Sequence, residues 1–151
     1  KNLSFAGERI GFAAVSPDMP QADLLVAAIT MTVRTLGFVN APIIGQKLAM
    51  SLLGEEADRA AYARRREAIS RVLADAGVSF RKPDGAFYVF AEAPGGDDLA
   101  FTDALLKENV LVVPGSGFGM KGYVRLSYSV EDRVIAGAAA GFKRAVAAMG
   151  G

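Results

Sequence analysis

The hydrophobic residues of this chain recur mainly with the spacing of amphipathic helices. Between Pro20 and Gly37 the apolar positions follow a period of 3.6 residues and predict a first helix. A second helix is expected from about Ala41-Pro42 to Leu53, a third over about 58–76 and a fourth over about 99–108. A last helix is predicted from one apolar stripe, and Ser129 with Asp132 forms a capping-box-like start for it. The stripe consists of Ile135, Ala138, Phe142, Ala145, Val146 and Met149.

Shorter segments rich in aromatic and β-branched residues predict strands. They are residues 9–16, ended by Pro17, and then 78–80, 86–91, 110–113 and 123–128. Strands that return through a helix and a loop indicate a small open sheet covered on one face by helices. The predicted fold class is therefore α/β with an α+β-like C-terminal part, built on a small mixed or antiparallel sheet.

Composition narrows the classes of protein. The chain has 151 residues, 52% of them hydrophobic and 22% charged, which is typical of one globular domain. A net charge of +1 gives no electrostatic footprint for nucleic acid, and no apolar run reaches the ~18 residues of a membrane span. The mean hydropathy of +0.27 is high, so the apolar surplus is expected in a core or an interface.

Cysteine and histidine are both absent from the sequence. Disulfides, thiolate nucleophiles, Cys/His metal sites, histidine bases and Ser-His-Asp triads are therefore excluded. Lysine, aspartate, glutamate and tyrosine remain as candidates for proton transfer. We expect no metal site, and the lack of cysteine is compatible with a cytoplasmic location.

The first eleven residues place one lysine and one arginine around a loop. Lys1 and Arg9 are eight residues apart, and Gly7 and Gly11 flank the arginine. This stretch resembles the lysine loop of class I and II (fold type I) aminotransferases of the aspartate aminotransferase type, which use pyridoxal phosphate (PLP). The resemblance implies that Lys1 forms a Schiff base with PLP and moves the substrate proton, and that Arg9 binds the PLP phosphate. The alternative is an exposed lysine and an exposed arginine without such roles.

Arg125 lies inside the alternating stretch Tyr123–Tyr128, after a loop that begins Pro114-Gly115-Ser116-Gly117-Phe118-Gly119. The loop resembles the Pro-Gly-x-x-Phe-Gly stretch of the same family, and Gly85-Ala86-Phe87-Tyr88 resembles its Gly-x-Phe-Tyr. The resemblance implies that Arg125 binds the substrate α-carboxylate, whereas an outward arginine on an edge strand is the alternative. The glycine-rich loop matches neither GxGxxG nor a P-loop, so positioning the carboxylate site is its expected role.

The resemblance covers nearly the whole chain and implies the C-terminal portion of a PLP-dependent transferase. Residues 1–39 would be a remnant of the large cofactor-binding domain, and 40–151 the small domain with a linking helix. Family residues upstream of the lysine cannot be assigned, so we expect a fragment that is inactive by itself. Ile10, Phe12 and Val15 would be exposed or covered by another chain, which predicts a homodimer or a rearranged N-terminal segment.

The implied reaction moves an amino group from an α-amino acid, with aspartate preferred, to a 2-oxo acid. Two alternatives remain open. One is a PLP-dependent lyase or decarboxylase of the same fold. The other is a stand-alone α/β module in which Arg125 binds a carboxylate without catalysis.

Overall fold

The computed structural model describes residues 3–4 and 6–150, which divide into two compact units, one ending at Ala57 and one starting at Asp58. The first unit contains the short 3-10 helix η1 (Ala6–Glu8) and the helices α1 (Ala22–Thr35) and α2 (Ile43–Ser51). The elements of the second unit are α3 (Arg59–Asp75), β1 (Tyr88–Glu92), η2 (Pro94–Gly96), α4 (Asp98–Lys107), β2 (Val113–Pro114), η3 (Gly115–Phe118), β3 (Tyr123–Ser127) and α5 (Asp132–Ala148).

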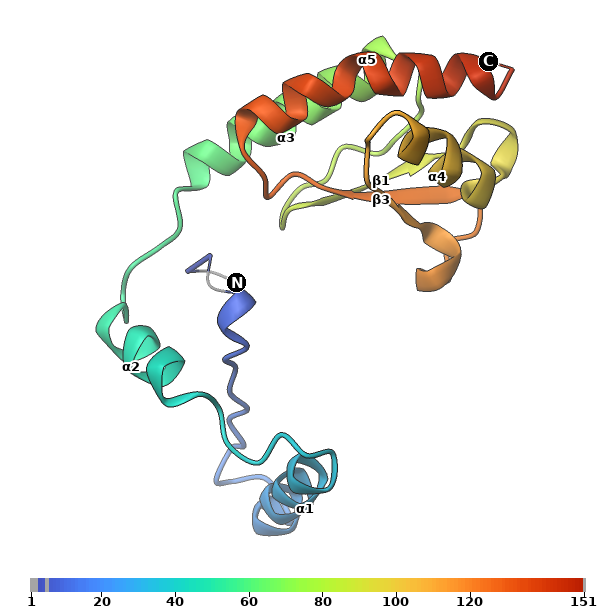
Figure 1. The fold of residues 1–151 in the computed structure, drawn as a ribbon. Helices are drawn as coiled ribbons and strands as arrows, with labels where there is room; N and C mark the ends of the chain where they lie inside the picture. The colour runs from blue at the N-terminus through green and yellow to red at the C-terminus, as the bar shows by residue number, and fades with distance from the viewer. Residues whose placement is uncertain (1–2, 5, 151) are drawn as a thin grey trace. The chain divides into compact units, whose positions relative to one another are not determined.

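The second unit is a layer of helices on a three-stranded antiparallel sheet. The strand order is β1-β3-β2, with Phe90 and Val113 both paired to Arg125 in the central strand. Helices α3 and α5 lie side by side over one face of the sheet (Figure 1). The predicted fold class, with a small sheet covered by helices, is confirmed.

The core of the second unit forms where the apolar sides of these layers meet. In β3, Val124 and Leu126 are buried while their neighbours are more exposed, and in β1 Val89 and Ala91 repeat the pattern. The helices cover these four positions with fully buried aromatic and aliphatic side chains, which are Leu73, Phe101, Leu105 and Phe142. Since strand side chains alternate between faces, Tyr88, Phe90, Tyr123 and Arg125 occupy the opposite, uncovered face.

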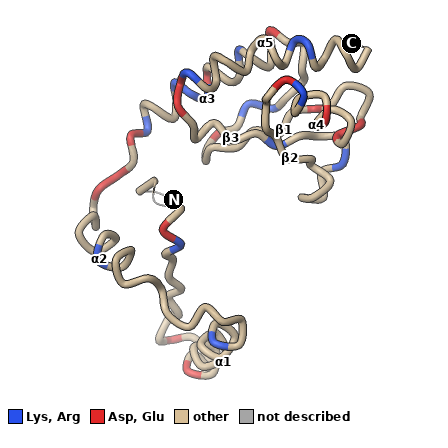
Figure 2. The backbone as a smooth tube through the Cα atoms, viewed as in Figure 1, with Lys and Arg blue, Asp and Glu red and all other residues tan. Residues whose placement is uncertain are grey.

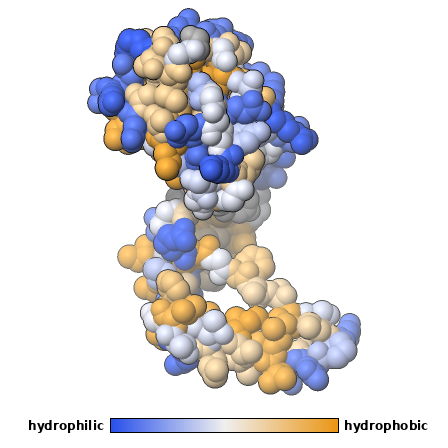
Figure 3. Space-filling model, turned by 90° about the vertical axis from the view of Figure 1, so that its right-hand side faces the viewer, coloured by the Kyte–Doolittle hydropathy of each residue, from blue (hydrophilic) through white to orange (hydrophobic). Residues whose placement is uncertain are grey.

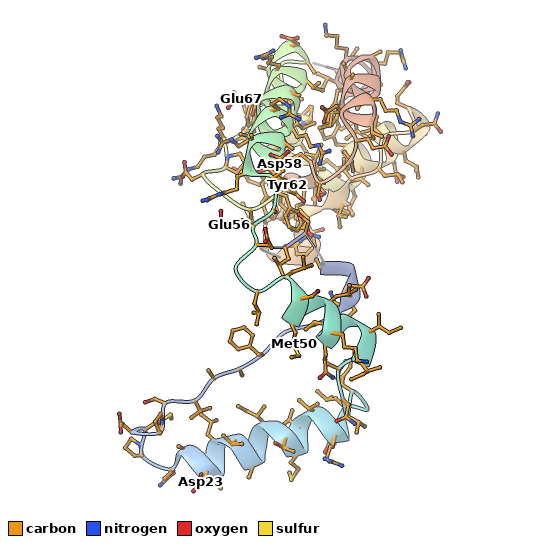
Figure 4. The ribbon with its side chains drawn as sticks, turned by 90° about the vertical axis from the view of Figure 1, so that its left-hand side faces the viewer. Asp23, Met50, Glu56, Asp58, Tyr62 and Glu67 are labelled. Carbon is orange, nitrogen blue, oxygen red and sulfur yellow. The ribbon has the colours of Figure 1, made fainter. Side chains whose placement is uncertain are left out.

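The first unit has no comparable core. Among its described residues only Gly45 is buried, and large apolar side chains of α1 and α2 are exposed, as with Ile44 at 70% and Met50 at 71%. Orange patches over these helices in Figure 3 and the labelled Met50 in Figure 4 show this surface. Charged residues are sparse along the same segment (Figure 2). The exposed large apolar side chains are thus concentrated in the first unit.

One close approach organises the first unit. A Cβ on Gly45 of α2 would lie 2.8 Å from Cγ1 of Ile10, so glycine at this position lets the segment after η1 pass against the helix. An apolar hollow of about 460 Å³ adjoins this contact and is lined by residues that include Phe12, Leu48 and Leu53. No helix of the described residues is long and apolar enough to cross a membrane.

Four local predictions need correction. Residues 9–16 form no strand, because a strand needs ladder partners and none of the described residues supplies them. Residues 78–80 contribute a single bridge, Phe80 to Ala91, and 110–113 contribute only Val113 to β2. Ser129 does not cap α5: Glu131 is the N-cap, without a side-chain bond, while the Ser129 hydroxyl lies 3.2 Å from the hydroxyl of Tyr62. Tyr62 lies in the first turn of α3 (Figure 4).

The helix predictions are confirmed to within a few residues at each end. The α5 stripe contacts the core as expected: Ile135, Phe142 and Ala145 are buried, and its other members are partly buried. Of the three large apolar residues in 9–16, Phe12 is 97% exposed, whereas Ile10 and Val15 are partly buried.

Two phenylalanines provide a matched test of the difference in burial between the two units. Phe142 is completely buried and Phe12 is 97% exposed. We expect Phe142→Ala to lower the free energy of unfolding by about 3–5 kcal/mol, because it removes apolar contacts and leaves a cavity. Phe12→Ala should change it by less than about 0.5 kcal/mol. Urea denaturation followed by circular dichroism measures both, and equal losses would show that Phe12 is buried in solution.

Candidate functional site

Arg125 is held on the uncovered face of the sheet by two aromatic rings. Its guanidinium carbon lies 3.7 Å from the ring centroid of Phe118 and 4.4 Å from that of Tyr88. Phe90, the strand partner of Arg125, meets Phe118 edge-on with centroids 6.3 Å apart. Cation–π attraction and stacking therefore position the charge.

The guanidinium N–H groups of Arg125 have no acceptor among the described residues. The side chain is partly buried, yet it forms no ion pair or side-chain hydrogen bond with a described residue. A guanidinium carries its N–H groups in its own plane, so stacking on rings leaves them available at the edge. A carboxylate can accept two parallel hydrogen bonds from such an edge. The arrangement is chemically suited to binding a carboxylate.

The loop before β3 brings Phe118 to this position. Gly115 is buried, and a side chain there would meet the backbone oxygens of Met120 and Tyr123, the latter at 2.6 Å. Met120 N–H donates to the Gly115 carbonyl at 2.9 Å, which closes the η3 turn. Glycine at position 115 is required because any Cβ would push the turn away from β3.

Asp98 fastens the same loop from α4. It is 3% exposed, and its Oδ2 accepts the N–H of Ser116 at 2.9 Å while its Oδ1 accepts the N–H of Gly122 at 3.3 Å. Its neighbour Asp97 instead caps α4 by accepting the N–H of Ala100 at 2.9 Å. The Ser116 N–H, followed by further hydrogen bonds, lowers the pKa of Asp98 below its ordinary 3.8 against the opposing effect of burial.

Tyr123 and Glu92 form a polar pair on the same face of the sheet as Arg125. The Tyr123 hydroxyl donates to Glu92 Oε1 at 3.2 Å, and the Glu92 charge raises the pKa of Tyr123, which keeps the phenol neutral. Both residues line an open hollow of about 430 Å³ together with Tyr88 and Phe90. No group of acidic side chains in the described residues could hold a metal ion.

Arg9 belongs to the first unit and directly follows η1. It is exposed, has a φ of 55°, and donates from Nη1 to the Ala6 carbonyl at 3.1 Å. A non-glycine residue in this left-handed region is uncommon, and such conformations concentrate at functional sites. Its other guanidinium donors have no partner in the described residues, and Gly7 and Gly11 leave open space beside it. A phosphate group could therefore reach it.

The predicted site residues thus fall in different places. Arg9 is in the first unit and Arg125 is in the second. Lys1 lies outside the described residues. Sequence reasoning did not find Asp98 as a loop anchor, nor the stacking of Tyr88 and Phe118 on Arg125. The pair Asp97-Asp98 was one available signal, because a helix needs only one of them as a cap.

The chain matches known proteins over most of its length. The family model described as aminotransferase class I and II matches residues 1–142. A probable aspartate/prephenate aminotransferase of Aquifex aeolicus is 32% identical over 91% of this chain and 37% of its own length. A solved amino transferase of Eubacterium rectale matches 100% of this chain and 38% of its own, with 36% identity and a TM-score of 0.83. An aspartate aminotransferase from Thermus thermophilus, solved with maleate, matches 94% of this chain with 27% identity and a TM-score of 0.71.

The fold and the matches lead to the same class of protein. The chain has the fold of a fragment of a PLP-dependent transferase and resembles aspartate aminotransferases. The chain belongs to the class I and II aminotransferase family. It spans little more than a third of the length of the relatives it matches.

The lowered pKa of Asp98 predicts how stability depends on pH. A carboxyl group whose folded pKa lies below its unfolded value stabilises the fold above the unfolded pKa and loses this effect as pH falls through the folded pKa. Above about pH 5, Asp98→Asn should therefore be less stable than the parent chain by a constant amount. The difference should shrink as pH falls below 3.8. Urea denaturation at a series of pH values measures it, and a difference that grows toward acid pH would contradict the assignment.

Proposed function

We propose that this chain is the C-terminal part of an enzyme that moves an amino group from an α-amino acid to a 2-oxo acid with PLP. Its Arg125 binds the α-carboxylate of the substrate. The observation that carries the proposal is the guanidinium of Arg125, which two rings hold while no described acidic residue pairs with it. A charge kept without a partner costs free energy unless a ligand or solvent satisfies it, and a substrate carboxylate supplies the matching charge.

We propose that residues near the start of the chain hold PLP. Arg9 would hold the phosphate with the guanidinium donors that the Ala6 carbonyl leaves free. Lys1 would bind the cofactor covalently, and its ε-amine would then move the proton at the substrate α-carbon. PLP, when bound, supplies an electron sink for charge that develops at that carbon. Arg125 would meanwhile orient the substrate by its carboxylate.

Aspartate is the donor that we prefer. The Aquifex aeolicus relative is called an aspartate/prephenate aminotransferase, and the Thermus thermophilus structure was solved with maleate, a dicarboxylate. The aminotransferase names of the matched relatives favour amino transfer over a lyase or decarboxylase reaction.

The 151-residue chain by itself is proposed to be inactive. Residues 1–39 would belong to the large cofactor domain and 40–151 to the small domain with its linking helix. No residue here can be assigned as the acidic partner of the pyridine nitrogen, without which PLP is a weak electron sink. The exposed apolar side chains of α1 and α2 support a homodimer, and a cytoplasmic location is part of the same proposal.

One observation favours a second candidate, a carboxylate-binding module without catalysis. Arg125, Tyr88, Phe118 and Asp98 all lie in the second unit, so this candidate assigns carboxylate binding to the second unit alone. Maleate binding that is equally tight with and without PLP would favour this candidate.

The cofactor assignment is tested by labelling. PLP is titrated into the chain, borohydride fixes it to the amine that holds it, and mass spectrometry locates the label. We expect saturable labelling at the Lys1 ε-amine that Arg9→Ala weakens, because the phosphate loses a charged partner. Arg133→Ala, at an exposed position of α5, is the control. Labelling scattered over several lysines, unchanged in Arg9→Ala, would contradict the assignment.

Arg125 is tested in the full-length enzyme that contains this chain. Arg125→Lys keeps the charge but loses the planar pair of donors, so the KM for aspartate should rise by roughly 10- to 100-fold. Arg133→Lys is the matched control, since Arg133 is exposed and pairs with Glu131. Steady-state kinetics measure both variants. A KM unchanged in Arg125→Lys would reject the carboxylate role.

A further inference from the structure

One carboxylate holds both ends of the loop that carries Phe118. Asp98 Oδ2 accepts from Ser116, at the start of η3, and Asp98 Oδ1 accepts from Gly122, directly before β3. The two N–H groups bracket the segment 116–122, so each oxygen of one buried side chain fixes one end of it. An amide could serve only one end, because its nitrogen donates and would face the other N–H.

Phe118 depends on this loop for its position. Its side chain is 45% exposed, so core packing alone does not hold the ring. The ring lies two residues after Ser116 in the same single turn, and Gly119, with a φ of 73°, reverses the chain directly after it. The close approach of Gly115 to the backbone oxygens of Met120 and Tyr123 leaves the turn little room to relax. A displacement of Ser116 would therefore also displace the Phe118 ring.

Arg125 in turn depends on Phe118. The ring centroid is 3.7 Å from the guanidinium carbon, nearer than that of Tyr88 at 4.4 Å. Without Phe118 the guanidinium would contact the Tyr88 ring alone, and its long side chain would sample more rotamers. A bidentate hydrogen bond requires the plane of the guanidinium to be set before the carboxylate arrives.

We infer that Asp98 is a positioning residue for substrate binding, because it acts through the 116–122 loop and Phe118 to set the plane of the Arg125 guanidinium. The inference rests on the proposed carboxylate role of Arg125. Asp98 itself is buried under the loop and contacts no substrate. Asp97, next to it, shares the chemistry but only caps α4.

The test compares kinetic constants in the full-length enzyme. We expect Asp98→Asn to raise the KM for aspartate at least fivefold while kcat at saturating aspartate changes less than twofold. Asp103→Asn is the matched control, since it makes the same carboxylate-to-amide change at an exposed position of α4 and leaves the bonds of Asp98 to Ser116 and Gly122 in place, and its KM should stay within twofold of the parent value. A folded Asp98→Asn enzyme with an unchanged KM would overturn the inference.

A double-mutant cycle separates positioning from general destabilisation. Phe118→Leu should also raise the KM, and adding Asp98→Asn to it should raise the KM by less than twofold more, because both act on one contact. Effects that multiply fully would overturn the route through Phe118. If Asp98→Asn does not fold, Phe118→Leu still decides, since an unchanged KM in that variant also overturns the route.

Arg125→Lys distinguishes a failure of the carboxylate role of Arg125 from a failure of the positioning role of Asp98. If it leaves the KM unchanged, the proposed carboxylate role is wrong and the positioning role falls with it. If Arg125→Lys raises the KM and Asp98→Asn does not, the carboxylate role stands and only the positioning role of Asp98 is rejected.

Discussion

Burial of Val124 and Leu126 in the core beneath the helices of the second unit decides where Arg125 points. A strand presents alternate side chains to opposite faces, so burying these two residues places the arginine between them on the other face. A slip of one residue in the register would drive a charge into the core and expose both apolar side chains. The helices that cover one face of the sheet thus define the site on the other.

The site is built from weak, directional contacts on this rigid base. Two aromatic rings stack on Arg125, and a loop fastened by Asp98 supplies one of them. Neither ring competes for the in-plane donors of the guanidinium, whereas a carboxylate partner would. The chain belongs to the class I and II aminotransferase family, and donors left open at the edge of the guanidinium are what the proposed carboxylate role of Arg125 requires.

The two units differ in how many apolar side chains they bury. The second buries aromatic and aliphatic side chains between its layers, while the described part of the first buries only Gly45. Residues 9–16 show the consequence: a segment rich in apolar residues remains outside any ladder when no neighbouring strand satisfies its backbone. Because the chain spans little more than a third of its relatives' length, its first unit corresponds to a minor part of their structure.

The sequence by itself determined the helices, the alternation in 123–128 and the class of chemistry, because each follows from local periodicity or from residues present and absent. The motifs around Lys1, Arg9 and Arg125 also identified the family. Only the tertiary structure decided that 9–16 stays unpaired, that Asp98 turns away from its helix to the loop, and that Phe118 and Tyr88 stack on Arg125. Two of these contacts join groups far apart in the chain: Asp98 and Ser116 are 18 positions apart, and Tyr88 and Arg125 are 37. Local sequence patterns do not predict such contacts, since the contacts form only when packed layers bring distant segments together.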